Sequence, residues 1–247
     1  MEQDYLLLRL ESSLQSWGMV SVDRKRPTHR VPTPSALSGL IGNALGWDRA
    51  FDADRLNSLM RHLTYGAAEI LTPEPLQDFQ TAMLRESAGW TTRGIAEERD
   101  GGSLDQSVIL RKDYLANGLF LVAMRIEEGA ETSLDEVSAA MMRPARPVFL
   151  GRKACVPTSP LHAGVLRAEC LRAALTNGTR ETLGALAQDP FRPRPTPKCT
   201  RVRAWLPEQE TEEGEPYYMD SLRNFKTDRF CGHLWFREFS LELGAPS

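Results

Sequence analysis

Long apolar runs are missing from this sequence of 247 residues. The longest, such as Leu6–Leu8 and Leu119–Ala123, are far shorter than the roughly 18 apolar residues of a membrane-spanning helix. The acidic N-terminal stretch carries Arg9 within its apolar part, so it lacks the basic head and the long apolar middle of a signal peptide. We therefore expect a cytoplasmic protein without a membrane partner.

Closely spaced cysteines are missing as well. The four cysteines are separated by 15, 29 and 32 positions, so no pair has the spacing of a metal knuckle or a redox motif. They are Cys155, Cys170, Cys199 and Cys231. The sequence also lacks a Walker loop, a dinucleotide fingerprint, a nucleophile-elbow serine and a His-Glu-x-x-His helix. We expect reduced thiols, and neither a metal ion nor a cofactor.

A strong net charge is the third absence, since 30 Lys and Arg residues face 33 Asp and Glu residues. The basic residues are nevertheless concentrated in three loop-like stretches, Arg24–Arg30, Arg143–Lys153 and Arg192–Arg203. In a chain of net charge −3, such segregation indicates basic patches that face a polyanion. Trp17 and Trp90 lie in loop-like contexts and could stack on unpaired bases, although packing in a core is the commoner role of a tryptophan.

The residue patterns predict a mixture of strands and helices. Thr33 followed by Pro34 is typical of a helix start, and Ser133 is the expected N-cap of a later helix. An Asn-Gly pair at 117–118 predicts a tight turn between two strands. The expected strands are Asp4–Glu11, Tyr65–Leu71, Leu76–Leu84, Val108–Leu115, Leu119–Glu127, Val148–Gly151 and pieces of Tyr217–Leu243, and the expected helices are Pro34–Leu45, Asp54–Leu63, Leu134–Met142 and Val165–Leu175.

One face of the helix that begins at Pro34 carries very small side chains. It consists of Ser35, Gly39, Gly42 and Gly46, although a glycine inside a helix costs about 1 kcal/mol relative to alanine. Close packing of the helix against a sheet is the commoner explanation of such a face. The alternative is that the backbone of a ligand approaches the start of the helix.

The order of these elements predicts an α+β fold with helices on one face of a sheet, most simply in a split β-α-β arrangement. Arg85–Asp105 is polar, contains few apolar residues and lies between two expected strands. We interpret it as the tip of a long hairpin excursion, because long loops in compact domains are usually functional or disordered. We expect a first domain over residues 1–150 and a smaller β subdomain over residues 151–247.

Three motifs occur in one order along the chain. The first is an apolar strand that ends in Leu-Gln-x-Trp-Gly, the second is an Arg-Pro-Thr lead into a Gly-rich helix, and the third is Leu-Gly-Arg-Lys-x-Cys. They are LLLRLESSLQSWG (Leu6–Gly18), RPTHRVPTPSALSGLIGNALG (Arg26–Gly46) and FLGRKACVPTSPL (Phe149–Leu161). Their order and spacing resemble the CasD family, whose members are subunits of the type I-E CRISPR surveillance complex, Cascade.

The resemblance implies a ferredoxin-like domain of the RNA-recognition-motif type, a thumb hairpin inserted at about residues 85–112 and a small C-terminal β subdomain. It also implies a non-catalytic, RNA-binding subunit of a ribonucleoprotein in antiviral defence, which holds the 5′ handle of the crRNA and caps the backbone of Cascade. The implied partners are crRNA, the CasC backbone subunit and the large CasA subunit, with target DNA met only through the assembled complex. The chain departs from the family pattern at His29-Arg30-Val31 and at His233.

The candidate RNA-binding residues come from the basic loops, from the helix start and from the strands that flank the thumb. We expect a cradle between Arg24–Arg30 and the first turn of the Pro34 helix, closed by Arg152 and Lys153, because a helix N-terminus offers unpaired N–H groups to a phosphate. The full set is Trp17, Arg24, Lys25, Arg26, His29, Arg30, Ser35, Arg85, Arg93, Arg111, Lys112, Arg152 and Lys153.

Two other functions are compatible with the residues. One is a metal-independent endoribonuclease that processes CRISPR repeat RNA, as related proteins of the I-C subtype do, with Tyr114, Lys112 and His29 as residues of suitable type. We expect His29 to lie in a basic, exposed loop, where a histidine more commonly contacts phosphate or solvent. The other is a scaffold that contacts only protein.

Overall fold

The computed structural model describes residues 2–21, 24–83, 107–189 and 200–244. The fold combines α-helices with antiparallel β-sheets. None of the described helices is long and apolar enough to cross a membrane. The helices are α1 (Pro34–Ala44), α2 (Ala53–His62), α3 (Leu134–Met142), α4 (Leu171–Gln188) and the short 3₁₀ turn η1 (Glu208–Glu210).

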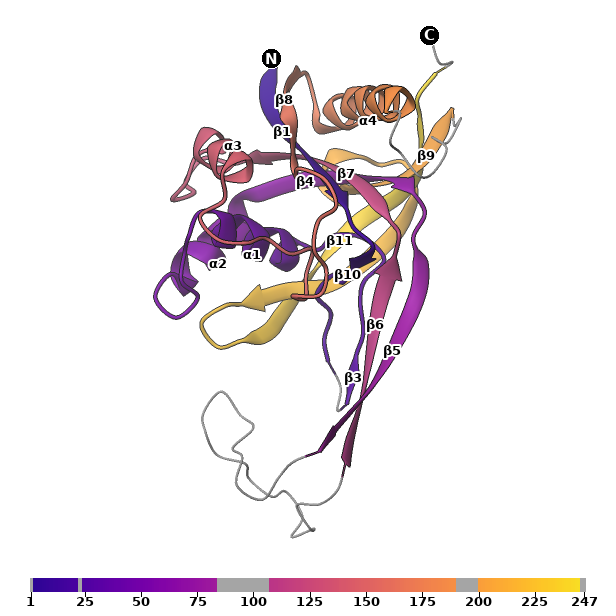
Figure 1. The fold of residues 1–247 in the computed structure, drawn as a ribbon. Helices are drawn as coiled ribbons and strands as arrows, with labels where there is room; N and C mark the ends of the chain where they lie inside the picture. The colour runs from indigo at the N-terminus through magenta and orange to yellow at the C-terminus, as the bar shows by residue number, and fades with distance from the viewer. Residues whose placement is uncertain (1, 22–23, 84–106, 190–199, 245–247) are drawn as a thin grey trace.

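One large sheet forms the body of the molecule (Figure 1). Its strand order is β10-β11-β9-β4-β7-β1-β8, and all neighbouring strands in it are antiparallel. These strands are β1 (Gln3–Glu11), β4 (Leu63–Leu71), β7 (Leu119–Ile126), β8 (His162–Ala168), β9 (Arg201–Pro207), β10 (Glu215–Asn224) and β11 (Arg229–Glu242). Segments from both ends of the chain therefore meet in one sheet, with β8 at one edge and β10 at the other.

The first strand is buried on both faces, which explains its nearly continuous apolar sequence. Leu6, Leu8 and Leu10 belong to a core shared with α1, α2 and α3. Tyr5 and Leu7 point the opposite way, into a second core that lies under α4. Three helices therefore cover one face of the sheet and α4 covers the other (Figure 1).

Two helices begin where the sequence predicts. Thr33 has an extended backbone and accepts the N–H of Ala36 through its hydroxyl, at 3.3 Å, directly before α1. Ser133 and Glu136 form a reciprocal capping box at the start of α3. The N–H of Ser133 donates to the carboxylate of Glu136 at 2.9 Å, and this bond holds the pKa of Glu136 below its ordinary value. Both predicted N-caps are confirmed.

A second, smaller sheet carries a long arm away from the body (Figure 1). Its two long strands pair continuously from Glu74 opposite Ala116 to Met83 opposite Ser107. Two short strands from the loop that follows β1 also pair with the arm. The strands of this sheet are β2 (Leu14–Gln15), β3 (Lys25–Arg26), β5 (Glu74–Met83) and β6 (Ser107–Ala116). The loop after β1 is therefore attached to the arm.

Two of the expected elements are wrong. Val148–Gly151 forms no strand, because Gly151 has a φ of +106° and the chain turns there. Val165–Leu175 is not one helix, since its first part belongs to β8 and pairs with β1, and α4 begins only at Leu171. Exposed and more buried side chains alternate along β8, which is the period of an edge strand and not of a helix.

The glycines of α1 have different surroundings. A Cβ at Gly42 would lie 2.3 Å from the Cδ2 atom of Leu56, whereas a Cβ at Gly39 would meet nothing within 4 Å. Packing against α2 therefore explains Gly42. Gly39 instead faces open space, so packing does not explain it.

We expect alanine substitutions to separate these two glycines. Gly42→Ala should lower the free energy of unfolding by about 1–3 kcal/mol, because the buried Leu56 has to move. Gly39→Ala should raise it by up to about 1 kcal/mol, because alanine loses less backbone entropy in a helix. Urea unfolding of both variants measures the difference, and a similar loss in both would contradict the prediction.

Candidate nucleic-acid interface

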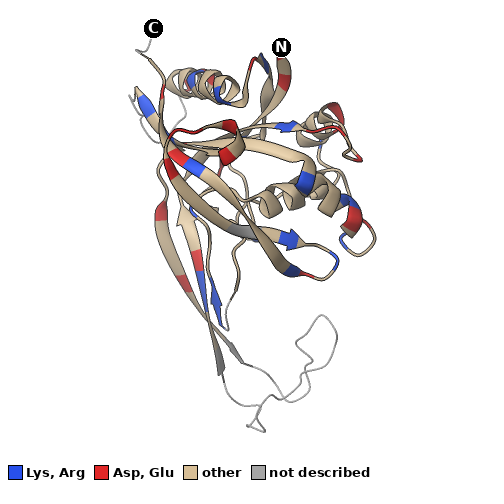
Figure 2. Cartoon of the chain, turned by 180° about the vertical axis from the view of Figure 1, so that it is seen from behind, with Lys and Arg blue, Asp and Glu red and all other residues tan. Residues whose placement is uncertain are grey.

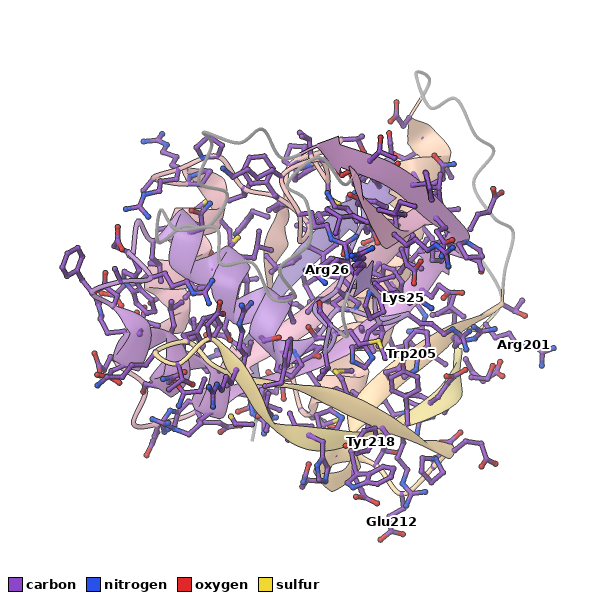
Figure 3. All side chains as sticks on the ribbon, turned by 90° about the horizontal axis from the view of Figure 1, so that it is seen from below. Lys25, Arg26, Arg201, Trp205, Glu212 and Tyr218 are labelled. Carbon is purple, nitrogen blue, oxygen red and sulfur yellow. The ribbon has the colours of Figure 1, made fainter. Side chains whose placement is uncertain are left out.

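Two basic segments that are far apart in the sequence lie side by side on the arm. β3 pairs in parallel with β6, which places Lys25 opposite Arg111 and Arg26 opposite Lys112. The N–H of Arg111 also donates to the carbonyl of Arg24, at 3.0 Å. We call Arg24, Lys25, Arg26, Arg111 and Lys112 the basic ladder (Figure 2 and Figure 3). Because side chains alternate along a strand, Lys25 and Arg111 lie on one face of this sheet, and Arg26 and Lys112 lie on the other. Like charges on paired strands repel, so this placement favours an anionic ligand.

Acidic side chains compensate the ladder only weakly. The ammonium of Lys25 is 3.9 Å from a carboxylate oxygen of Asp113, in a pair that is open to solvent and worth little energy. Asp113 also accepts a hydrogen bond from Gln77, at 2.8 Å. The ammonium of Lys112 donates to the neutral amide oxygen of Gln80, at 2.6 Å. The ladder therefore keeps a net positive charge.

A cleft of about 570 Å³ opens next to the ladder, against α1. Its walls come from the loop after β1, the α1–α2 loop, the segment before β8, and the ends of β10 and β11 with the turn between them. Among the described residues that line it there is no Asp or Glu. Its cations are Arg26, Arg49, Arg146, Arg152, Lys153 and Arg223. The cleft is thus positively charged on several sides.

The rest of the cleft lining suits an extended, unpaired strand of nucleic acid. Ser35 and Gly39 of α1 contribute to the lining, and the first turn of a helix adds N–H groups and a partial positive charge. Four aromatic rings also line it, of which Trp47 and Phe225 are buried and Phe149 and Phe230 are half-buried. Proteins that bind single strands combine cations for the phosphates with aromatic rings for the bases in this way.

Arg152 connects the cleft to the ladder. Its guanidinium donates to the backbone carbonyls of Asp113 and Arg26, each at 2.7 Å, and lies 4.7 Å from the ring centre of Tyr114. The residue before it, Gly151, has a positive φ, and a Cβ there would lie 1.8 Å from a carbonyl oxygen of the loop after β1. Arg152 is therefore held against the ladder as part of the frame of the site.

Three predicted site residues are buried, and of these Ser35 lines the cleft whereas Trp17 and His29 do not. Trp17 is 1% exposed and contacts Phe120 edge to face, so its ring offers no face to a base in this conformation. His29 is 7% exposed, and its backbone N–H donates to the backbone carbonyl of Trp17 at 3.0 Å. The expectation that His29 lies in an exposed loop is wrong, because this bridge draws the loop onto the core.

The other predicted residues fall into three groups. Ser35 and Lys153 line the cleft. Arg30 is exposed and lies next to Tyr217 of β10, whose pKa is raised by burial despite the nearby arginine. Arg85 and Arg93 lie outside the described residues, as do Trp90 and the rest of the excursion to residue 105.

The third basic stretch, Arg192–Arg203, lies mostly outside the described residues. Its last part forms the start of β9. There the guanidinium of Arg203 is 3.3 Å from a carboxylate oxygen of Glu238. Figure 3 shows Arg201 at the periphery of the molecule, away from Lys25 and Arg26. The described end of this stretch is therefore not part of the ladder.

Three cations of the cleft were not predicted from the sequence. Arg146 belongs to the basic stretch Arg143–Lys153, and the concentration of charge there was the available signal. Arg49 stands between acidic residues, and Arg223 lies in a segment of mixed charge, so no local pattern marks either. Only the folded chain brings them to the same cleft.

The chain is similar to a known protein family, to a relative from Escherichia coli and to solved structures. The family model described as CRISPR-associated protein (Cas_Cas5) matches residues 5–229. The CRISPR system Cascade subunit CasD of Escherichia coli (strain K12) is 30% identical over 177 residues, which cover 71% of this chain and 77% of the relative.

The solved structures support the fold. A chain of a CRISPR RNA-guided surveillance complex aligns with a TM-score of 0.65 and 23% identity, over 97% of this chain and 90% of its own. The crystal structure of a Cas protein aligns with a TM-score of 0.55 and 22% identity, over 98% and 100% of the two chains. At such identities the likeness concerns the fold alone.

We expect Arg152 to be structurally important as well as basic. Arg152→Ala should lower the free energy of unfolding by about 1.5–3 kcal/mol, because two backbone carbonyls lose a charged hydrogen-bond donor. Lys153→Ala, at the neighbouring exposed position, should change it by less than about 0.5 kcal/mol. Urea unfolding provides the measurement, and equal values for the two variants would show that the bridge contributes nothing.

Proposed function

Because the chain belongs to the Cas5/CasD family of CRISPR-associated proteins, we propose that it is a non-catalytic subunit of a Cascade-type surveillance complex that binds the 5′ handle of the crRNA. One observation carries the proposal: the basic ladder meets, at Arg26 and Arg152, a cleft whose described lining contains no Asp or Glu. Phosphate contacts of this kind supply most of the affinity for a nucleic acid. Phe149 and Phe230, the half-buried rings of the cleft, supply surfaces for unpaired bases.

We also propose that the central strands form a ferredoxin-like domain. The order β8-β1-β7-β4, with helices between β1 and β4 and between β7 and β8, supports this assignment. Since β8 would be its fourth strand, we place the boundary to the C-terminal β region after Ala168, and not at residue 150 as expected from the sequence. The arm of β5 and β6 is the base of the proposed thumb.

The arm is also the proposed contact for the CasC and CasA subunits. Phe79 is 58% exposed and Ile109 is 38% exposed. Phe79 pairs with Arg111 and Ile109 with Thr81, so these apolar side chains share a face of the sheet with Arg111 and with Lys25, its partner on β3. A face of this composition suits a surface that is partly protein and partly RNA. Target DNA would be met only through the assembled complex.

The endoribonuclease alternative has less support. Tyr114 is 5% exposed under the guanidinium of Arg152, and His29 is 7% exposed. An acid and a base for RNA cleavage have to reach the ribose hydroxyl and the phosphodiester.

Salt dependence tests the phosphate contacts. We expect Arg26→Ala to weaken the binding of handle RNA to the full chain and to lower the magnitude of the slope of log K against log salt by about 0.7–1 unit. Arg167→Ala is the matched control, because Arg167 lies on β8 and is paired with Asp4. If both variants keep the wild-type affinity and slope, the ladder is not the RNA site.

Gly39→Ala changes the shape of the cleft without changing its charge, and we propose to measure it in the same salt titration. Its methyl group would occupy open space in the cleft, so it should weaken binding while leaving the salt slope unchanged. An unchanged affinity would mean that RNA does not approach α1 at this position.

A cleavage assay separates the proposal from its alternative. Purified protein incubated with CRISPR repeat RNA should leave the RNA intact, because His29 and Tyr114, two of the three side chains offered for cleavage, are buried. Cleavage that disappears in His29→Ala would favour the endoribonuclease. Cleavage that persists in this variant would indicate a contaminating nuclease.

A further inference from the structure

Two arginines of the cleft share one carboxylate. Arg49 comes from the α1–α2 loop and Arg223 from the end of β10, and both contact the same oxygen, Oδ1, of Asp228. Asp228 ends the turn between β10 and β11, where its φ is +59°. Both arginines line the cleft, whereas Asp228 is not among the lining residues. The wall of the cleft opposite the ladder is therefore built from segments about 170 residues apart.

Other contacts hold this wall together without Asp228. The N–H of Phe225 donates to the side-chain amide of Asn57 on α2, at 2.9 Å, and Phe225 is 7% exposed. Lys226 lies 3.8 Å from a carboxylate oxygen of Asp54. The side-chain oxygen of Asn224 accepts the backbone N–H groups of Lys226 and Thr227, at 3.0 and 3.2 Å. The positions of the two arginines thus do not depend on their shared carboxylate alone.

The arginine pair carries more positive charge than Asp228 neutralises. Two guanidinium groups against one carboxylate leave a net charge of +1. The Nε atom of Arg223 is buried and has no hydrogen-bond partner in the described part of the chain. Burial, and after it the charge of Arg49, lowers the pKa of Arg223. Unused donors and excess charge are the features that an anion would satisfy.

We propose that Arg49 and Arg223 bind one phosphate group of the RNA strand in the cleft. Without RNA, the carboxylate of Asp228 occupies this position, and the phosphate displaces it on binding. A phosphate offers several acceptor oxygens, so it can bond both guanidinium groups at once. The site rests on the proposed function for the identity of its ligand. It adds a contact on the wall opposite the ladder, supplied by the β10–β11 turn.

The proposal predicts that removing an ion pair strengthens binding. Asp228→Asn should tighten the binding of handle RNA to the full chain by about three- to tenfold, because the phosphate no longer competes with a carboxylate. Asparagine tolerates a positive φ, so the turn should persist. Arg223→Gln should weaken binding and lower the salt slope by about 0.7 unit.

Asp4→Asn is the matched control for the change in net charge. The Asp4 side chain is 54% exposed, close to the 56% of Asp228, and it pairs with Arg167 at 3.3 Å on the β1–β8 edge. Non-specific attraction would tighten RNA binding equally in both variants. If Asp228→Asn binds RNA no better than Asp4→Asn, the phosphate site is overturned while the proposed function stands.

A second measurement does not depend on RNA. Thermal unfolding with tripolyphosphate should show a larger rise in Tm for Asp228→Asn than for Asp4→Asn. If wild-type protein binds no handle RNA, the proposed function fails, and tripolyphosphate alone then decides the anion site. Equal rises in Tm for Asp228→Asn and Asp4→Asn would overturn the anion site.

Discussion

The guanidinium of Arg152 connects parts of the molecule that the chain keeps far apart. It bonds the carbonyl of Arg26 in the loop after β1 and that of Asp113 on the arm, and it covers the ring of Tyr114. The positive φ of Gly151 allows the turn that brings it there. This bridge therefore fixes the segment before β8 to the ladder and supports the pairing of β3 with β6.

Segregation of charge gives an acidic protein a basic surface. Three acids of the segment between β9 and β10 pair with arginines: Glu210 with Arg125, Glu213 with Arg172 and Glu208 with Arg237. None of these arginines lines the cleft. These glutamates are thus held in ion pairs with arginines outside the cleft, so they do not neutralise the cations that line it.

Local signals predicted most of the described elements, and their failures have clear physical causes. The N-caps at Thr33 and Ser133 were predicted correctly because each side-chain oxygen lies within a few residues of the helix N–H group that it accepts. The prediction of one helix over Val165–Leu175 was wrong because its first part pairs as a strand with β1, which is remote in the sequence. The burial of His29 was missed because a bridge to Trp17 decided it.

The sequence by itself determined the helix starts, the apolar strands, the concentration of Arg and Lys in loops, and three motifs typical of the CasD family. These features depend on neighbouring residues. Only the tertiary structure decided which cations share a surface, since β3 meets β6 and Arg49 meets Arg223 through pairings across about 90 and 170 residues. It also decided which α1 glycine is packed and which is open, because that depends on Leu56 and the shape of the cleft.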